Sequence, residues 1–138
     1  MLKNLIFVSL IVFLTPSCKK KEASALNYAI PYTQVNFSKN LNLPEMVDLR
    51  STGGWVYVSG GSRGIVLYRY NQEEIRAYDR HSTYNVSAGC QVFVNPETET
   101  EVLDTCSSST FLLNSGDPVS GPATIPLQQY QTALNNYI

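Results

Sequence analysis

Residues 55–78 read Trp55-Val-Tyr-Val-Ser-Gly-Gly-Ser-Arg-Gly-Ile-Val-Leu-Tyr-Arg-Tyr-Asn-Gln-Glu-Glu-Ile-Arg-Ala-Tyr78. The stretch holds three runs rich in β-branched and aromatic residues, which are typical of strands. Gly60-Gly61 and the polar residues 71–74 separate the runs and favour turns. The sequence therefore predicts three consecutive strands, at residues 55–58, 64–70 and 74–78.

The burial of the second and third strands is predicted from their patterns. Residues 64–70 have a continuous apolar centre, which indicates burial on both faces. Residues 74–78 alternate polar and apolar side chains, which indicates a half-buried strand.

The rest of the chain from residue 28 onward follows the same pattern, with poor helix signals and no internal repeat. The segment 30–49 has scattered apolar residues and two prolines, and we expect one or two extended strands that cover or join the sheet. Residues 132–138 fit either a short helix or a closing strand. We predict further strands at residues 90–94 and 101–103, which form a hairpin around Asn95-Pro96-Glu97, at 111–113 before a turn at 114–118, and at 125–130.

The N-terminus has the three-part layout of an export signal. Lys3 precedes an apolar run at residues 5–14, which is too short to span a membrane as a helix, since about 20 residues are needed. Turn-forming residues and Cys18 follow, so residues 1–17 resemble a bacterial lipoprotein signal; the alternative is a buried helix that ends in a free cysteine. The resemblance implies that Cys18 carries acyl chains, with each buried methylene contributing about 0.8 kcal/mol of membrane affinity.

Residues 18–27 form the lipidated cysteine and a polar tether. The lysines at 19–21 either touch anionic head groups or belong to a solvated spacer. Exported proteins meet an oxidising environment, where disulfides persist.

Composition and charge define one globular domain at residues 28–138. The chain has 138 residues, of which 43% are hydrophobic and 15% charged, and this excludes wholesale disorder. Residues 23–138 carry six Lys/Arg against ten Asp/Glu, a net charge of about −4, so we expect no nucleic-acid partner. We find no phosphate-binding loop and no nucleophile with a neighbouring base, and we expect no enzyme activity.

Three motifs resemble the Rieske iron–sulfur domain. Residues 77–80 (Ala-Tyr-Asp-Arg) look like its lead-in to a first loop, 109–111 (Ser-Thr-Phe) like the Ser-x-Phe after a second loop, and 121–130 (Gly-Pro-Ala-Thr-Ile-Pro-Leu-Gln-Gln-Tyr) like its closing motif. In that family each loop supplies one Cys and one His to a two-iron cluster. The resemblance implies an all-β, Rieske-like antiparallel β-sandwich or barrel with two loops at the tip.

The ligand positions of the family are all changed in this chain. The resemblance places Ser82 and Tyr84 at the Cys and His of the first loop, and Asp104 and Ser107 at those of the second. The cluster needs two imidazoles, and the chain has one histidine, His81. We therefore expect no cluster, no resident metal and no other cofactor.

The two cysteines of the domain have a counterpart in the family. Some Rieske domains carry an extra cysteine pair that joins the two loops, and the resemblance implies a Cys90–Cys106 disulfide. In the chain-entropy model such a bridge contributes about 3 kcal/mol. Free thiols, metal ligation and a redox-labile thiol switch remain alternatives.

His81 and Asp104 allow two further site hypotheses, each with a simpler structural alternative. His81, Asp104 and a thiolate are suitable ligand types for a mononuclear zinc or iron, but such a histidine is more often a hydrogen-bonded loop residue. Asp104 with Ser107 suggests acid–base work, but such a carboxylate is more often a turn or capping group.

The sequence thus predicts a membrane-anchored lipoprotein of the bacterial cell envelope, periplasmic or surface-facing, with a binding or structural role, as part of an envelope protein complex. We expect His81, Tyr84 and Ser107 at the tip to contact its partner. The alternative is an iron–sulfur electron-transfer protein with non-standard ligation.

Overall fold

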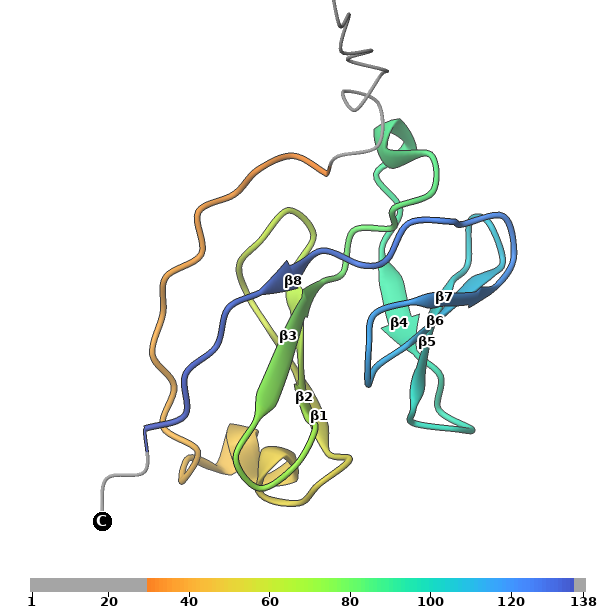
Figure 1. Ribbon diagram of the computed structural model, residues 1–138. Coiled ribbons are helices and arrows are strands. Elements are labelled where there is room, and N and C mark those ends of the chain that lie inside the picture. The colour runs from red at the N-terminus through yellow and green to blue at the C-terminus, as the bar shows by residue number, and fades with distance from the viewer. Residues whose placement is uncertain (1–29, 136–138) are drawn as a thin grey trace, which may run out of the picture.

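The computed structural model describes residues 30–135 and has two antiparallel sheets of four strands each (Figure 1). The predicted export signal (1–17) and the lipidated Cys18 with its tether (18–27) lie outside the described residues. Within residues 30–135, no helix has the length and apolar character needed to cross a membrane. The all-β class is confirmed. The first sheet has the order β1 (Trp55–Val58), β2 (Ile65–Arg69), β3 (Ile75–Asp79), β8 (Gln129–Tyr130), and the second β4 (Val92–Val94), β5 (Glu101–Asp104), β6 (Ser109–Leu112), β7 (Pro118–Ser120).

The three predicted consecutive strands are confirmed as the antiparallel meander β1–β2–β3. Every residue of β2 is buried, as its apolar centre predicts. The expectation of a half-buried β3 is wrong, because only Arg76 on this strand keeps partial exposure. One face of β3 meets the second sheet, and the other is covered by segments from outside the meander.

The second sheet confirms the hairpin around Asn95, with Val92 opposite Asp104 and Val94 opposite Val102. Strand β7 was not predicted, since residues 114–118 read only as a turn. The last strand is much shorter than the predicted run 125–130, because only Tyr130 and Gln129 pair with β3. Pro122 and Pro126 have no N–H to donate, which limits regular pairing in that segment.

Two clusters of buried side chains stabilise the layers. One lies between the sheets and includes Val66, Tyr78, Val102 and Phe111. The other lies on the outer face of the first sheet. Figure 1 shows the extended N-terminal segment and the C-terminal segment beside that face, which makes a third, partial layer.

The segment 30–49 contains a helix where extended strands were expected. The 3₁₀ helix η2 (Pro44–Arg50) begins with a proline, whose fixed φ suits the first turn of a helix. Met46 and Leu49 are buried, and their spacing of three places both on one side of a 3₁₀ helix. No strand forms in residues 30–43, and residues 132–135 adopt neither a helix nor a strand; residues 136–138 lie outside the description.

Tyr78 predicts a loss of stability at alkaline pH. Its side chain is fully buried, its hydroxyl has no hydrogen-bond partner among the described residues, and burial raises its pKa to about 12 from an ordinary value of about 10. The folded protein therefore holds this proton more tightly than the unfolded chain. The associated stability is complete below about pH 10 and falls as the pH rises toward 12.

Urea unfolding from neutral to alkaline pH checks this prediction. We expect Tyr78→Phe to keep its stability at neutral pH and to lose less than the wild type above about pH 10. Tyr32→Phe, which alters an exposed ring, is the control and should follow the wild type. Parallel losses in Tyr78→Phe and the wild type would contradict the assignment.

Candidate functional site

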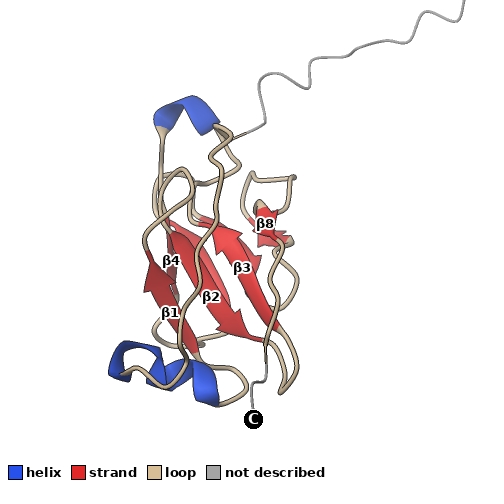
Figure 2. Ribbon diagram, turned by 90° about the vertical axis from the view of Figure 1, so that its left-hand side faces the viewer, coloured by secondary structure: helices blue, strands red, loops and turns tan. Residues whose placement is uncertain are grey.

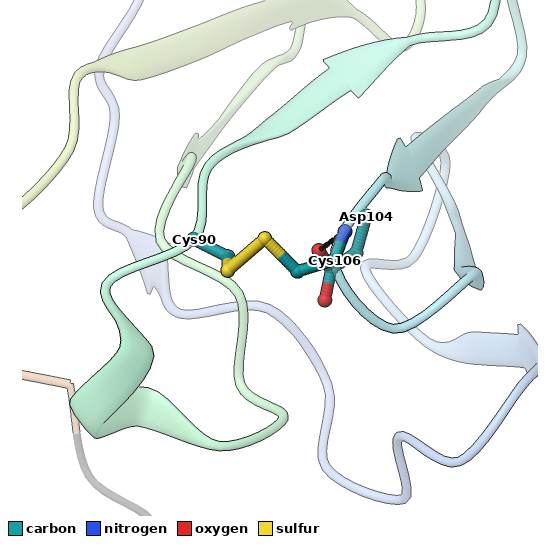
Figure 3. A group of neighbouring side chains, drawn as sticks. All are labelled: Cys90, Asp104 and Cys106. Carbon is teal, nitrogen blue, oxygen red and sulfur yellow. Dashed lines mark hydrogen bonds between the residues drawn. A yellow bond between two sulfur atoms is a disulfide. The ribbon is translucent and has the colours of Figure 1, made fainter.

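Two loops meet at the end of the domain opposite η2. The first loop, residues 80–91, joins β3 to β4 and contains the short 3₁₀ helix η3 (Val86–Ala88), which lies at that end in Figures 1 and 2. The second loop, residues 105–108, joins β5 to β6. A disulfide between Cys90 and Cys106 joins the loops, with an S–S distance of 2.08 Å (Figure 3). The disulfide that the resemblance implied is therefore present.

Asp104 is the centre of the hydrogen bonds between the loops. It is 1% exposed at the end of β5. Its Oδ2 accepts hydrogen bonds of 2.6 Å from the hydroxyls of Ser82 and Ser107, and its Oδ1 accepts one of 2.9 Å from the Cys106 N–H (Figure 3 shows the last). These four residues are called the Asp104 network below. The network holds a buried carboxylate with donors from both loops, as a buried charge requires.

Further hydrogen bonds extend the Asp104 network into the rest of the tip. Ser109 Oγ lies 2.8 Å from the Ser107 hydroxyl and accepts the Ala123 N–H at 3.1 Å. The Ser82 N–H donates to the Cys90 carbonyl at 2.9 Å. The first loop is thus closed on itself, and the segment that carries the closing motif is tied to the second loop.

A second buried carboxylate, Asp79, fixes the glycine-rich loop 60–64 beneath the tip. Its Oδ2 accepts the Ser62 N–H at 2.5 Å and the Tyr130 hydroxyl at 2.7 Å. Its Oδ1 accepts the N–H groups of His81 at 2.8 Å and Arg63 at 3.2 Å. The sequence marks Asp79 only as part of a motif, because three of its four donors come from two segments that are distant in the chain, residues 62–63 and Tyr130.

Gly61 and Tyr130 show how closely Asp79 is packed. Gly61 has a φ of +62°, a conformation that favours glycine. A Cβ at this position would also collide with the Asp79 carboxylate, so a larger residue does not fit. Burial raises the pKa of Tyr130, and its hydrogen bond to Asp79 raises it further. The phenol therefore stays a donor to the carboxylate.

His81 points into the protein rather than toward a partner. It is 3% exposed, and its Nε2 lies 2.9 Å from the carbonyl oxygen of Val86. Because a carbonyl only accepts, Nε2 carries the hydrogen, and in the neutral ring Nδ1 accepts from the Ser62 hydroxyl at 2.8 Å. The expectation that the His81 side chain forms part of an exposed contact surface is wrong, because both ring nitrogens make hydrogen bonds inside the protein, to Ser62 and Val86.

The other predicted contact residues differ in exposure. Tyr84 is 42% exposed on the first loop, and its N–H donates to Ser82 Oγ at 3.2 Å. Ser107 is half-buried, with its hydroxyl in the Asp104 network. Of the three, Tyr84 alone presents a large side-chain surface.

The possible metal ligands of the tip are already engaged. Among residues 30–135, a single group of three His, Cys, Asp or Glu side chains brings its ligand atoms within 4.8 Å of one another: Cys90, Asp104 and Cys106. His81 is not part of this group, so the arrangement of His81, Asp104 and a thiolate does not form. The two sulfur atoms are bonded to each other, and the carboxylate accepts three hydrogen bonds.

Comparison with known proteins does not assign the chain to a family. Neither protein-family models nor curated proteins give a match. The function is therefore inferred from the residues and geometry of the tip.

Proposed function

We propose that this protein is an exported, membrane-anchored lipoprotein whose Rieske-like domain has lost its cluster ligands and serves a binding or structural role. One observation carries the proposal. Three of the four positions that the resemblance aligns with cluster ligands meet at a single carboxylate, that of Asp104. The fourth, Tyr84, donates its N–H to Ser82 in the same network.

Hydrogen bonds and a disulfide supply the cohesion that metal–ligand bonds give in the family. A cluster ligated by two loops fixes both loops in position. Here Ser82 from the first loop and Ser107 from the second bond to Asp104, and Cys90–Cys106 joins the loops covalently. This arrangement links the two loops through protein groups, which supports a role in recognition.

In this proposal the export signal and Cys18 determine the cellular location of the protein. Residues 1–17 direct export, acyl chains on Cys18 hold the protein at a membrane, and residues 19–27 separate the domain from it. The exposed Tyr84 ring then offers a contact for an envelope protein, since tyrosine is enriched at protein interfaces.

An iron–sulfur electron carrier with non-standard ligation is the second candidate. The convergence of Cys90, Asp104 and Cys106 favours it, because two thiolates and a carboxylate are suitable iron ligands. The disulfide opposes it, since metal binding needs both sulfurs as thiolates.

Two measurements on the full chain test the proposal. In cells able to build clusters and supplied with a radiolabelled fatty acid, we expect label on the wild type and none on Cys18→Ser. We expect the purified protein to contain close to no iron and no acid-labile sulfide. About two of each per chain, as a [2Fe–2S] centre requires, would replace the proposal by the electron carrier. Absence of label from the wild type would contradict the membrane anchor.

A further inference from the structure

We propose that an open hollow beside the first loop binds an oxyanion, a carboxylate or phosphate group of a small polar molecule, through Arg63 and Arg80. The hollow has a volume of about 830 Å³ and lies between residues 57–64 and residues 89–91. Both arginines line it. The inference does not depend on the proposed function, because none of the aligned cluster-ligand positions takes part.

Arg80 supplies a buried cation without a counter-ion. It is 8% exposed, and the single ion pair among the described residues joins Arg76 to Glu74. Burial lowers the pKa of Arg80, which shows that its charge is costly in this environment. An anion that enters the hollow would offset this cost by pairing with the charge.

The guanidinium of Arg80 is held in a fixed orientation. Its Cζ lies 3.6 Å from the ring centroid of Tyr57 and 4.8 Å from that of Phe93. Its Nε donates to the Val92 carbonyl at 3.0 Å. These contacts engage Nε and the planar face, and they leave the terminal amino groups for a ligand. A preorganised guanidinium loses little freedom when it binds an oxyanion with two parallel hydrogen bonds.

Arg63 supplies the second cation on a fixed backbone. Its N–H donates to Asp79, and its carbonyl accepts a hydrogen bond from the Gln91 side chain. Its side chain is exposed, and its guanidinium lies beside Gly89, another residue that lines the hollow.

The charge around the hollow favours an anion. No Asp or Glu lines it, although the described residues carry more carboxylates than cations. Asp79 is the nearby acid, and its carboxylate lies beneath the loop with four hydrogen bonds. Two of the six Lys and Arg residues after position 23 therefore face a space free of lining carboxylates.

The remaining lining indicates a polar ligand. Ser59 offers a hydroxyl and Gln91 the second N–H of its side-chain amide, whereas the Ser62 hydroxyl already donates to His81. A guanidinium binds carboxylate and phosphate by the same geometry, so both chemistries fit.

The test is a titration of the ¹⁵N-labelled full chain in detergent micelles, followed by amide NMR shifts at constant ionic strength. The probes are glucuronate, glucose 6-phosphate and neutral glucose. We expect saturable shifts at residues 60–64 and Gln91 with at least one charged probe and none with glucose; the tighter of the two identifies the preferred oxyanion. Arg63→Gln should weaken binding roughly tenfold, as expected for one charged hydrogen bond.

Two further variants extend the test, and the exposed Arg63→Gln keeps it decisive if the change at buried Arg80 affects folding. Arg80→Lys keeps the charge but loses the planar fork, and it should also weaken binding. Arg50→Gln removes an exposed arginine, bonded to the carbonyls of Leu41 and Asn42, and should leave affinity unchanged. The proposal is overturned if neither charged probe saturates, if glucose gives the same shifts, or if Arg63→Gln binds like the wild type.

Discussion

Replacing Asp104 by alanine is expected to lower the free energy of unfolding by about 3 kcal/mol. The change removes the acceptor for the Ser82 and Ser107 hydroxyls and for the Cys106 N–H. A donor left without a partner costs about 1–3 kcal/mol where it is buried, as Ser82 is, and less at Ser107 and Cys106, which are partly open to water. The summed loss for the three donors stays near the lower end of what three such costs would give. The Ser82 and Ser107 hydroxyls can rotate toward other acceptors, whereas the Cys106 N–H cannot.

Chemical denaturation of Asp104→Ala beside Asp117→Ala measures this effect. Asp117 is exposed, and its carboxylate makes no hydrogen bond among the described residues, so its removal should change stability by less than about 0.5 kcal/mol. Asp104→Asn should fall between the two, since an amide keeps one acceptor oxygen but turns a donor toward another donor. If Asp104→Ala is as stable as Asp117→Ala, the carboxylate does not hold the loops together.

Removing the disulfide with the double variant Cys90→Ser/Cys106→Ser is expected to lower the free energy of unfolding of the wild type by about 3 kcal/mol. The bridge spans a sequence separation of 16, and the chain-entropy model attributes its contribution to the restricted unfolded chain. Cys18→Ser, which changes a cysteine outside the domain, is the control and should unfold like the wild type. A double variant with wild-type stability would show that the bridge does not constrain the unfolded chain.

The disulfide and Asp104 should also be coupled, because both connect the first loop to the second. The triple variant Asp104→Ala/Cys90→Ser/Cys106→Ser tests this in a double-mutant cycle. We expect its loss of stability to differ from the sum of the separate losses by roughly 0.5–3 kcal/mol. Strict additivity would mean that the two links act independently.

Local pattern was enough to predict the first sheet's meander and the hairpin of the second. In residues 55–78 the β-branched and aromatic runs alternate with turn residues, and each strand pairs with its sequence neighbour. Such contacts need only short loops, so the information lies within a short stretch of sequence. The disulfide was accessible only through the resemblance, since the positions of two cysteines in a sequence do not reveal whether their Cα atoms lie close enough to bond.

The tertiary structure alone decided where the buried charges lie. Asp79 combines donors from residues 62–63, His81 and Tyr130, and no local pattern marks such a set. The sequence suggested an exposed role for His81, whereas the fold turns its ring inward. The sequence by itself determined the all-β class and the meander, because strand and turn preferences act over a few residues. The burial of β3, the helix η2, the Asp104 network and the arginine-lined hollow depend on segments far apart in the chain, and only packing brings those segments together.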